Sequence, residues 1–177
     1  MTIPMYKQTN IKGCSLYKGI NGVFPAKPCA LDCVINSPTI TFASTDVSLM
    51  GTYSAPDVTR IENCQLTVEV EANSPDTRPL FSAGLQEWMI VSITGMINAV
   101  TRLEEVVRYT IFATGSLAEI PSVELSPGSE GKITLTMNCM SYKKIDQNNV
   151  VIDHIDRINR TVIIGGEDFS TPINQLL

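Results

Sequence analysis

Two segments of the chain alternate strictly between apolar and polar residues. In Cys64–Glu71 every even position is apolar and every odd position is polar, and Lys132–Cys139 repeats the pattern with the apolar residues at odd positions. A period of two places one face of a strand on a core and the other in water. The alternation therefore predicts two half-buried strands and a mainly β fold with an antiparallel sandwich or barrel-like architecture.

Further strands are predicted from β-branched and aromatic residues. The segments 88–94 and 106–114 are apolar on both faces for part of their length, which is typical of strands covered on each side. A polar turn at 144–149 precedes an extended segment at 150–160, so residues 132–160 are predicted to form one long closing hairpin. Weaker strand signals lie at 13–24 and 30–35.

Helical signals are few. Ser74-Pro75-Asp76 is a start for one short flanking helix closed by Gly84, although Pro79 limits its length. Thr101–Glu104 matches a capping box and predicts a helix, whereas the flanking strands favour a hairpin tip at the same place. The hairpin tip is the preferred interpretation.

Length and composition favour one soluble domain over residues 1–177. Hydrophobic residues make up 44% of the 177 positions, and the net charge is −5. Residues 1–60 hold five basic and three acidic groups, and residues 61–177 hold eight and fifteen. This acidity disfavours a free-standing nucleic-acid binder. We find neither an export signal nor a run of about 18 apolar residues that would insert into a membrane.

No catalytic, cofactor-binding or metal-binding set is evident, so we expect a protein that is not an enzyme. His154 is the only histidine, and in Asp153-His154-Ile155-Asp156 alternate residues of a strand point to opposite faces. Cys29 and Cys33 are separated by three residues rather than the two usual in zinc knuckles and redox pairs. The five cysteines are expected to be buried thiols.

Several stretches, taken in order, resemble the major tail tube protein family of contractile-tailed (Mu-like) bacteriophages and phage-tail-derived bacteriocins. The resemblance spans about residues 14–168, and its order and spacing are more specific than any one piece. It departs from the family at the last hairpin, where Asp146-Gln147-Asn148-Asn149 replaces Asp-Gly, and at the C-terminus. The matching stretches are Cys33–Ile40, Leu49–Asp57, Ile120–Gly128, Met140–Lys144, Val150–Asp156 and Ile163–Asp168.

The resemblance implies a structural virion protein without cofactors. Six copies would close into a ring whose strands form a barrel around a channel, and rings would stack into a tube inside a contractile sheath. The implied partners are further copies of the chain, the sheath, a baseplate or tube initiator and a tail terminator, with DNA passing through the lumen without specific binding. The implied location is the virion tail, assembled in the bacterial host cytoplasm.

Two alternatives stay open. One is the tube of a tail-derived bacteriocin or contractile injection system, and the other is a monomeric β-sandwich module that binds a ligand.

The resemblance also suggests roles for particular segments. Residues 44–60 are a candidate ring-stacking loop, residues 1–13 an N-terminal arm and residues 169–177 a C-terminal tail. The candidate lumen-lining residues are Gln65, Thr67, Glu69, Glu71, Thr134, Thr136 and Asn138. The candidate stacking residues are Leu49, Met50, Gly51, Thr52, Tyr53, Pro56 and Asp57.

Overall fold

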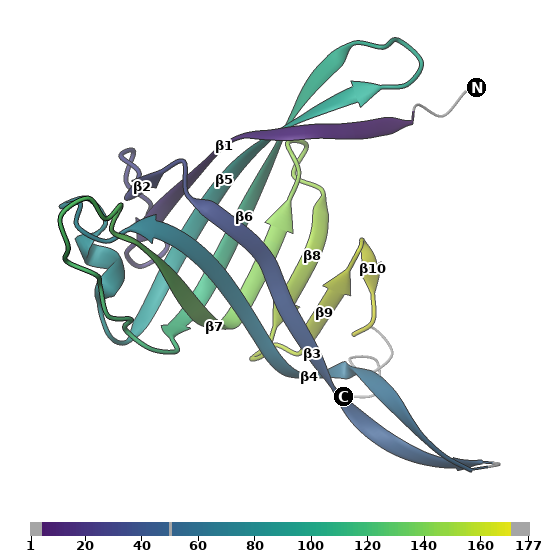
Figure 1. Cartoon of the computed structure of the whole chain (residues 1–177). Coiled ribbons are helices and arrows are strands. Elements are labelled where there is room, and N and C mark those ends of the chain that lie inside the picture. Colours follow the sequence, from purple (N-terminus) through teal and green to yellow (C-terminus); the bar gives the residue numbers. More distant parts are fainter. Residues whose placement is uncertain (1–4, 50, 171–177) are drawn as a thin grey trace.

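The chain folds as a mainly antiparallel β-sandwich, which confirms the predicted fold class (Figure 1). The computed structural model describes residues 5–49 and 51–170. The elements are β1 (Tyr6–Gly19), β2 (Ala30–Leu31), β3 (Val34–Leu49), β4 (Gly51–Glu71), η1 (Arg78–Phe81), β5 (Leu85–Asn98), β6 (Glu104–Leu117), β7 (Lys132–Ile145), β8 (Val151–Asp156), β9 (Thr161–Ile164) and β10 (Glu167–Asp168).

The main layer has the strand order β10-β9-β8-β7-β6-β5-β1-β2, and β3 and β4 cross over one face of it (Figure 1). Strand β7 joins the two layers because two strands share one of its edges. Its first half, Lys132–Asn138, pairs with Glu71–Gln65 of β4, and its second half, Ser141–Ile145, pairs with β8. The opposite edge of β7 pairs with β6. The sheet therefore forks at β7 and does not close into a barrel.

The alternating segments form the core as predicted. The apolar side chains of Cys64–Val70 and Ile133–Cys139 are all buried, and they form one core cluster with Leu16 of β1 and with Trp88 and Ile90 of β5. Burial of side chains of this size contributes about 1.5–3 kcal/mol each, so these two faces supply much of the free energy of folding.

A buried glutamine ties η1 to the core. Gln86 Nε2 donates to the carbonyl oxygens of Leu80 (3.1 Å) and Ser82 (2.7 Å), and its Oε1 accepts a hydrogen bond from Trp88 Nε1 (3.0 Å). These contacts satisfy polar groups that are cut off from water, where an unpaired group costs about 1–3 kcal/mol. The predicted flanking helix is thus a single 3-10 turn, begun at Thr77 and held by the side chain of Gln86.

Two hairpins project from the body at opposite ends (Figure 1). One is the tip of β5 and β6 together with the start of β1. The other, called here the β3–β4 arm, comprises residues 43–58. At its base the ladder passes from the pair Phe42 and Ile61 to the pair Ala43 and Asp57, so three residues of β4 bulge out. Such a bulge bends the strand and aims the arm away from the body.

The structure corrects several predicted boundaries. Residues 44–49 and 51–60, expected within a loop, belong to β3 and β4. The signal at 13–24 overlaps β1 only as far as Gly19, and β1 begins at Tyr6 and therefore includes part of the expected N-terminal arm. The signal at 30–35 is divided between β2 and β3, because Asp32 adopts a positive φ of 52° that no strand continues through. The hairpin tip at 99–103 is confirmed, and β8 ends at Asp156 rather than Arg160.

Gly115 lies opposite Cys139 at a bulge in the β6–β7 ladder. A Cβ atom at this position would overlap the carbonyl oxygen of Asn138, whereas one at Gly13 would meet nothing within 4 Å. Gly115→Ala is therefore expected to lower the free energy of unfolding by about 1–3 kcal/mol. Gly13→Ala, the matched control, is expected to change it by less than about 1 kcal/mol. Urea denaturation measures both, and equal midpoints for the two variants would contradict the close packing at this bulge.

Candidate functional site

The seven predicted lumen-lining residues share one face of β4 and β7. The register pairs Gln65 with Asn138, Thr67 with Thr136, and Glu69 with Thr134. Gln65 Nε2 donates to Asn138 Oδ1 at 2.9 Å. Because their neighbours in sequence are buried, these side chains point away from the core. The residues predicted from spacing thus form one continuous polar surface, called here the polar face.

Lys132 balances part of the negative charge at one end of the polar face. Lys132 pairs with Glu71 in the register, and its Nζ lies 3.0 Å from Glu130 Oε2. Glu130 and, more weakly, Glu69 and Glu71 raise the pKa of Lys132. Lys132 therefore stays charged at neutral pH. Its charge offsets the carboxylates at this end of the polar face.

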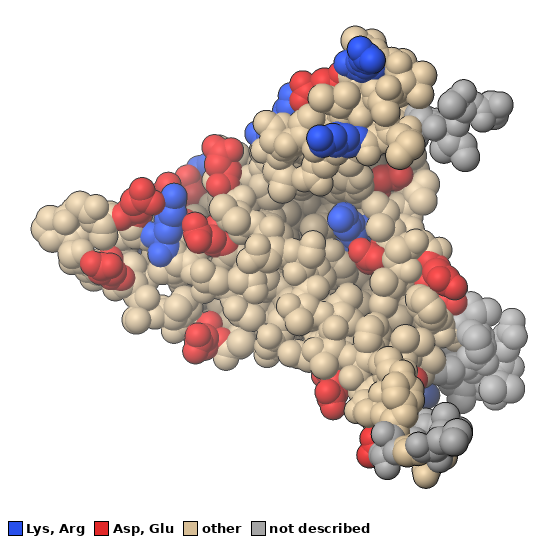
Figure 2. All heavy atoms as spheres, turned by 45° about the vertical axis from the view of Figure 1, so that its right-hand side comes forward, with Lys and Arg blue, Asp and Glu red and all other residues tan. Residues whose placement is uncertain are grey.

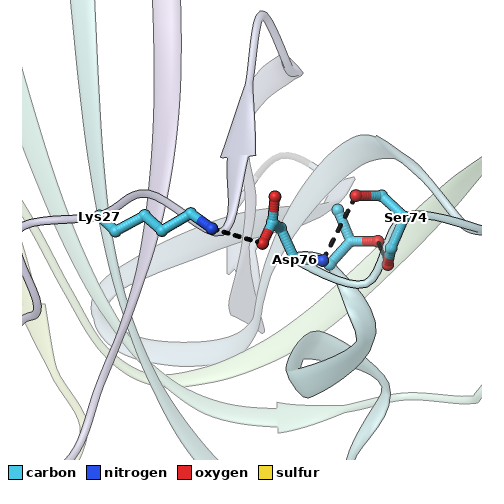
Figure 3. A network of polar contacts seen from close by, with 4 residues as sticks. Lys27, Ser74 and Asp76 are labelled. Carbon is cyan, nitrogen blue, oxygen red and sulfur yellow. Dashed lines mark hydrogen bonds and ion pairs between the residues drawn. The ribbon is translucent and has the colours of Figure 1, made fainter.

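A second ion pair closes the same end of the molecule (Figure 3). Lys27 Nζ lies 2.8 Å from Asp76 Oδ1, and the Asp76 amide donates to Ser74 Oγ at 3.3 Å. The hydrogen bond to Asp76 raises the pKa of Lys27. This contact connects the β1–β2 loop to the turn before η1, although both side chains are exposed and the pair contributes little stability.

The predicted stacking residues lie along the β3–β4 arm. Gly51 is at its tip and Tyr53 is exposed beside it, while Met50 is outside the described residues. The backbones of Leu49 and Thr52 belong to the last pairs of the ladder. The tip of the arm therefore combines backbone pairing with at least one exposed aromatic ring.

Pro56 and Asp57 have structural roles at the base of the arm. Asp57 Oδ1 accepts hydrogen bonds from the amide (3.1 Å) and hydroxyl (2.6 Å) of Thr59, which form the bulge. The hydroxyl contact, followed by the amide, lowers the pKa of Asp57. Pro56 pairs with Ser44, and a proline in a strand is tolerated where its missing N–H would face outward from an edge.

Long strand edges are left without partners within the described residues. The register pairs the outer edge of β1 with β2 only at Ser15 and Leu16, so Tyr6–Gly13 has no strand partner on that side. Residues 51–64 of β4 have no strand partner on the outer edge, and neither does β3 on the edge away from β4. Open edges expose unpaired N–H and C=O groups that can pair with another chain.

A groove of about 590 Å³ lies between the open edge of β1 and the start of β3; it is called here the seam groove. Residues of β5 and β6 form its floor, and among them Ile90, Thr94 and Ile111 are buried. Tyr109 lies on this floor with Lys144 Nζ 4.9 Å from its ring centroid. The groove is also lined by Gln8, Ile11, Lys12, Asp32, Val34 and Met96.

Charge is distributed unevenly over the molecule. A large zone at the centre of the face in Figure 2 has no charged side chain, and red and blue groups lie around it. Uncharged surface of this kind loses less hydration energy when another protein covers it. The face is therefore suited to contact with a further chain.

A family model described as phage tail tube protein FII matches residues 31–176. This chain belongs to that family. No curated protein matches the chain. Membership makes it a structural component of the phage tail and of the virion, one that assembles with itself and with other tail components, and it suggests a protein without enzymatic activity. None of the helices in the described part of the chain is long and apolar enough to cross a membrane.

The residues considered for catalysis or metal binding in this tail tube protein do not converge. His154 pairs with Lys143 across the ladder, Asp153 Oδ1 accepts the amide of Gly165 (2.9 Å), and Asp156 Oδ1 accepts the amides of Ile158 and Asn159. Both carboxylates thus hold turns. Among residues 5–49 and 51–170 no group of three metal-ligating side chains comes together.

The cysteines form neighbouring pairs that the sequence did not indicate. Cys33 contacts Cys14, and Cys64 contacts Cys139 across β4 and β7. Their mutual contact, followed by burial, raises the pKa of Cys33 and of Cys139. All five are free thiols, and four of them are buried as expected, whereas Cys29 is half-buried.

The lowered pKa of His154 makes the stability of the fold depend on pH. Burial, followed by repulsion from Lys143, lowers the pKa of His154 below its ordinary value of 6.5. The unfolded chain then binds a proton more readily than the folded chain, so stability is lost as pH falls through about 6.5. His154→Gln is expected to flatten the dependence of the urea midpoint on pH between about 7.5 and 5.5. An unchanged dependence in the variant would contradict this origin.

Proposed function

We propose that six copies of the chain close into a ring, and that stacked rings form the inner tube of a contractile phage tail through which DNA passes during ejection. The observation that carries the proposal is the set of long open edges on β1, β3 and β4 in a sheet that does not close on itself. Family membership gives the general role, and the open edges supply a means of joining subunits.

Ring closure is supported by the energetics of strand edges. A long unpaired edge invites uncontrolled association unless it is covered or paired. Head-to-tail contacts generate a closed ring when their rotation completes a circle. Pairing the edges of neighbouring subunits satisfies the backbone groups and joins the separate sheets into one wall around a channel.

The polar face is our proposed lining of that channel. Its hydroxyl, amide and carboxylate groups lie opposite the core on the strands that would form the wall. Carboxylates repel the phosphate backbone, and hydroxyl and amide groups offer no net charge to attract it. DNA would therefore slide past the wall without lasting contacts.

Stacking is assigned to the β3–β4 arm. The arm extends beyond the body at one end of the molecule, so it reaches the neighbouring ring when rings are stacked along the tube (Figure 1). Residues 1–13 and 169–177, where described, are proposed as further contacts between subunits. Outside the tube, the partners are a contractile sheath, a baseplate or initiator and a tail terminator, with assembly in the host cytoplasm. A tail-derived bacteriocin would use the same tube without a genome.

The purified protein is expected to form rings about 100 Å wide and tubes of stacked rings in negative-stain electron microscopy. Replacing Val47–Tyr53 by Asn-Gly retains the pair Asp46 and Ser54 and closes the ladder with a tight turn. This short-arm variant is expected to form rings and no tubes, because it loses the part of the arm that reaches the next ring.

A control with Asn-Gly inserted in place of Thr101-Arg102, at the tip of the other hairpin, keeps the arm intact and should form tubes. A wild-type protein that stays monomeric at high concentration would overturn the proposed function, and tubes from the short-arm variant would overturn the role of the arm.

Charge reversal tests the proposed channel lining. Glu69→Lys with Glu71→Lys places two cations per subunit on the polar face, and tubes of this variant are expected to retain DNA that wild-type tubes release, with retention falling as salt increases. Filter binding of labelled DNA to purified tubes measures the difference. The control reverses Glu119 and Glu124, which lie in the exposed 118–131 connection. Equal retention by wild-type and polar-face variant tubes would contradict the assignment.

A further inference from the structure

Two thiols in contact join the layers of one subunit and are not used by the channel or by the arm. Cys14 lies in the second half of β1, and Cys33 directly precedes β3. The Cys33 thiol donates to the carbonyl oxygen of Cys14, with 3.6 Å between sulfur and oxygen, and the two side chains also contact one another. These cysteines therefore connect the main layer to the start of the second layer.

A second pair of thiols, Cys64 and Cys139, provides an internal comparison. The β4–β7 ladder pairs Gln65 with Asn138, which places these two cysteines directly opposite one another. Cys64 is 1% exposed and Cys139 is 2% exposed, and both belong to the core cluster. A small molecule therefore reaches this pair only when the fold opens.

The first pair lies beside two hollows of the surface. Cys14 and Cys33 both line the seam groove. Cys33 also lines a second hollow of about 540 Å³, whose wall includes the ion pair of Lys27 with Asp76 (Figure 3). No residue of Tyr6–Gly13 lines this second hollow, so pairing of the β1 edge with a neighbouring subunit does not by itself cover it. A small reagent therefore has a route to the first pair in the folded subunit.

Thiols in contact form a disulfide by exchange with a small disulfide. The contact with Cys33 lowers the pKa of Cys14, which favours Cys14 as the first thiolate. Its sulfur attacks one sulfur of the small disulfide and displaces the other as a thiolate. Cys33 then attacks Cys14 Sγ in this mixed disulfide and displaces the second half. The two cysteines are oxidised, the small disulfide is reduced, and two small thiols leave with the two protons.

The surroundings of the chain change when a virion leaves its host. Glutathione and thioredoxin keep thiols reduced inside cells, whereas a released virion meets an oxidising medium. The chain is a virion component by its family. The same two thiols are therefore reduced during synthesis and meet small disulfides afterwards.

We propose that Cys14 and Cys33 are a disulfide-forming site, which a low-molecular-weight disulfide oxidises in the folded subunit. The bond closes a loop that includes β2 and joins β1 to the start of β3. It thereby anchors at the main layer the strand that continues into the β3–β4 arm. The bond also restricts the unfolded chain and so stabilises the fold.

Oxidised glutathione, added to the purified full-length protein, tests the site. The remaining thiols are alkylated in urea, and the peptides are analysed by mass spectrometry. Cys14 is expected to be joined to Cys33, and Cys64 and Cys139 are expected to be alkylated. The urea midpoint of the oxidised protein is expected to exceed that of the reduced protein, and dithiothreitol should restore the lower value.

Two variants separate the steps of the reaction. Cys33→Ser keeps a hydroxyl donor beside Cys14 and removes the second thiol, so it is expected to stop at the mixed disulfide of Cys14 with glutathione and to show no rise in the midpoint. Cys29→Ser is the matched control, because it removes a half-buried thiol outside the pair. It is expected to form the same bond between Cys14 and Cys33 as the wild type.

The proposed site is overturned if glutathione leaves Cys14 and Cys33 reduced in the wild type, or joins either of them to Cys29. Linkage of Cys64 with Cys139 at the same rate would also overturn it, because access through the hollows would then not decide which pair reacts. The pair lies within one subunit, so these results do not depend on ring formation. They are distinct from failure of the proposed function, in which the wild type forms no rings.

Discussion

The divided edge of β7 is the constraint on which the architecture depends. A strand has two edges, and one edge of β7 is paired with β6, so β4 and β8 have to share the other. β4 and β8 each pair with only part of the length of β7, and the sheet therefore splits into two layers that diverge from β7. The split buries the alternating faces of β4 and β7 against Leu16 and Trp88 and, at the same time, leaves the far parts of β3 and β4 beyond the body.

The same split accounts for the surfaces that remain open. A second layer of only two strands covers part of the main layer, and the seam groove lies beside the start of that cover at β3. The strand edges on each side of the groove are unpaired for the same reason. A protein that acted alone would be expected to protect such edges with charges, prolines or extra strands. Their persistence in a tail tube protein is consistent with a subunit whose fold is completed by its neighbours.

Sequence patterns predicted the parts of this structure that depend on local periodicity. Cys64–Glu71 and Lys132–Cys139 were correctly assigned because burial on one face imposes a period of two, and that period also identified the polar face. The arm was misread as a loop because Gly51 and Pro56 are typical of turns, and both are tolerated at the tip or open edge of a hairpin.

The seam groove could not have been predicted. Gln8, Met96 and Lys144 come together only through the order of the strands. The contact of Gln86 with Trp88 and η1 likewise depends on tertiary packing rather than on a motif.

Pro56 makes the two sides of the β3–β4 arm unequal. Proline has no N–H, so a strand lying along the β4 side of the arm would lack a hydrogen-bond donor at this position. Along the β3 side, residues 39–49 contain no proline, and Pro38 lies where the ladder is already interrupted between Asn36 and Thr39. A chain that forms backbone hydrogen bonds with the arm therefore meets a different set of donors on the β3 edge and on the β4 edge. One proline thus makes the two edges of the hairpin chemically different, so that a partner strand can add to the arm in a single preferred way.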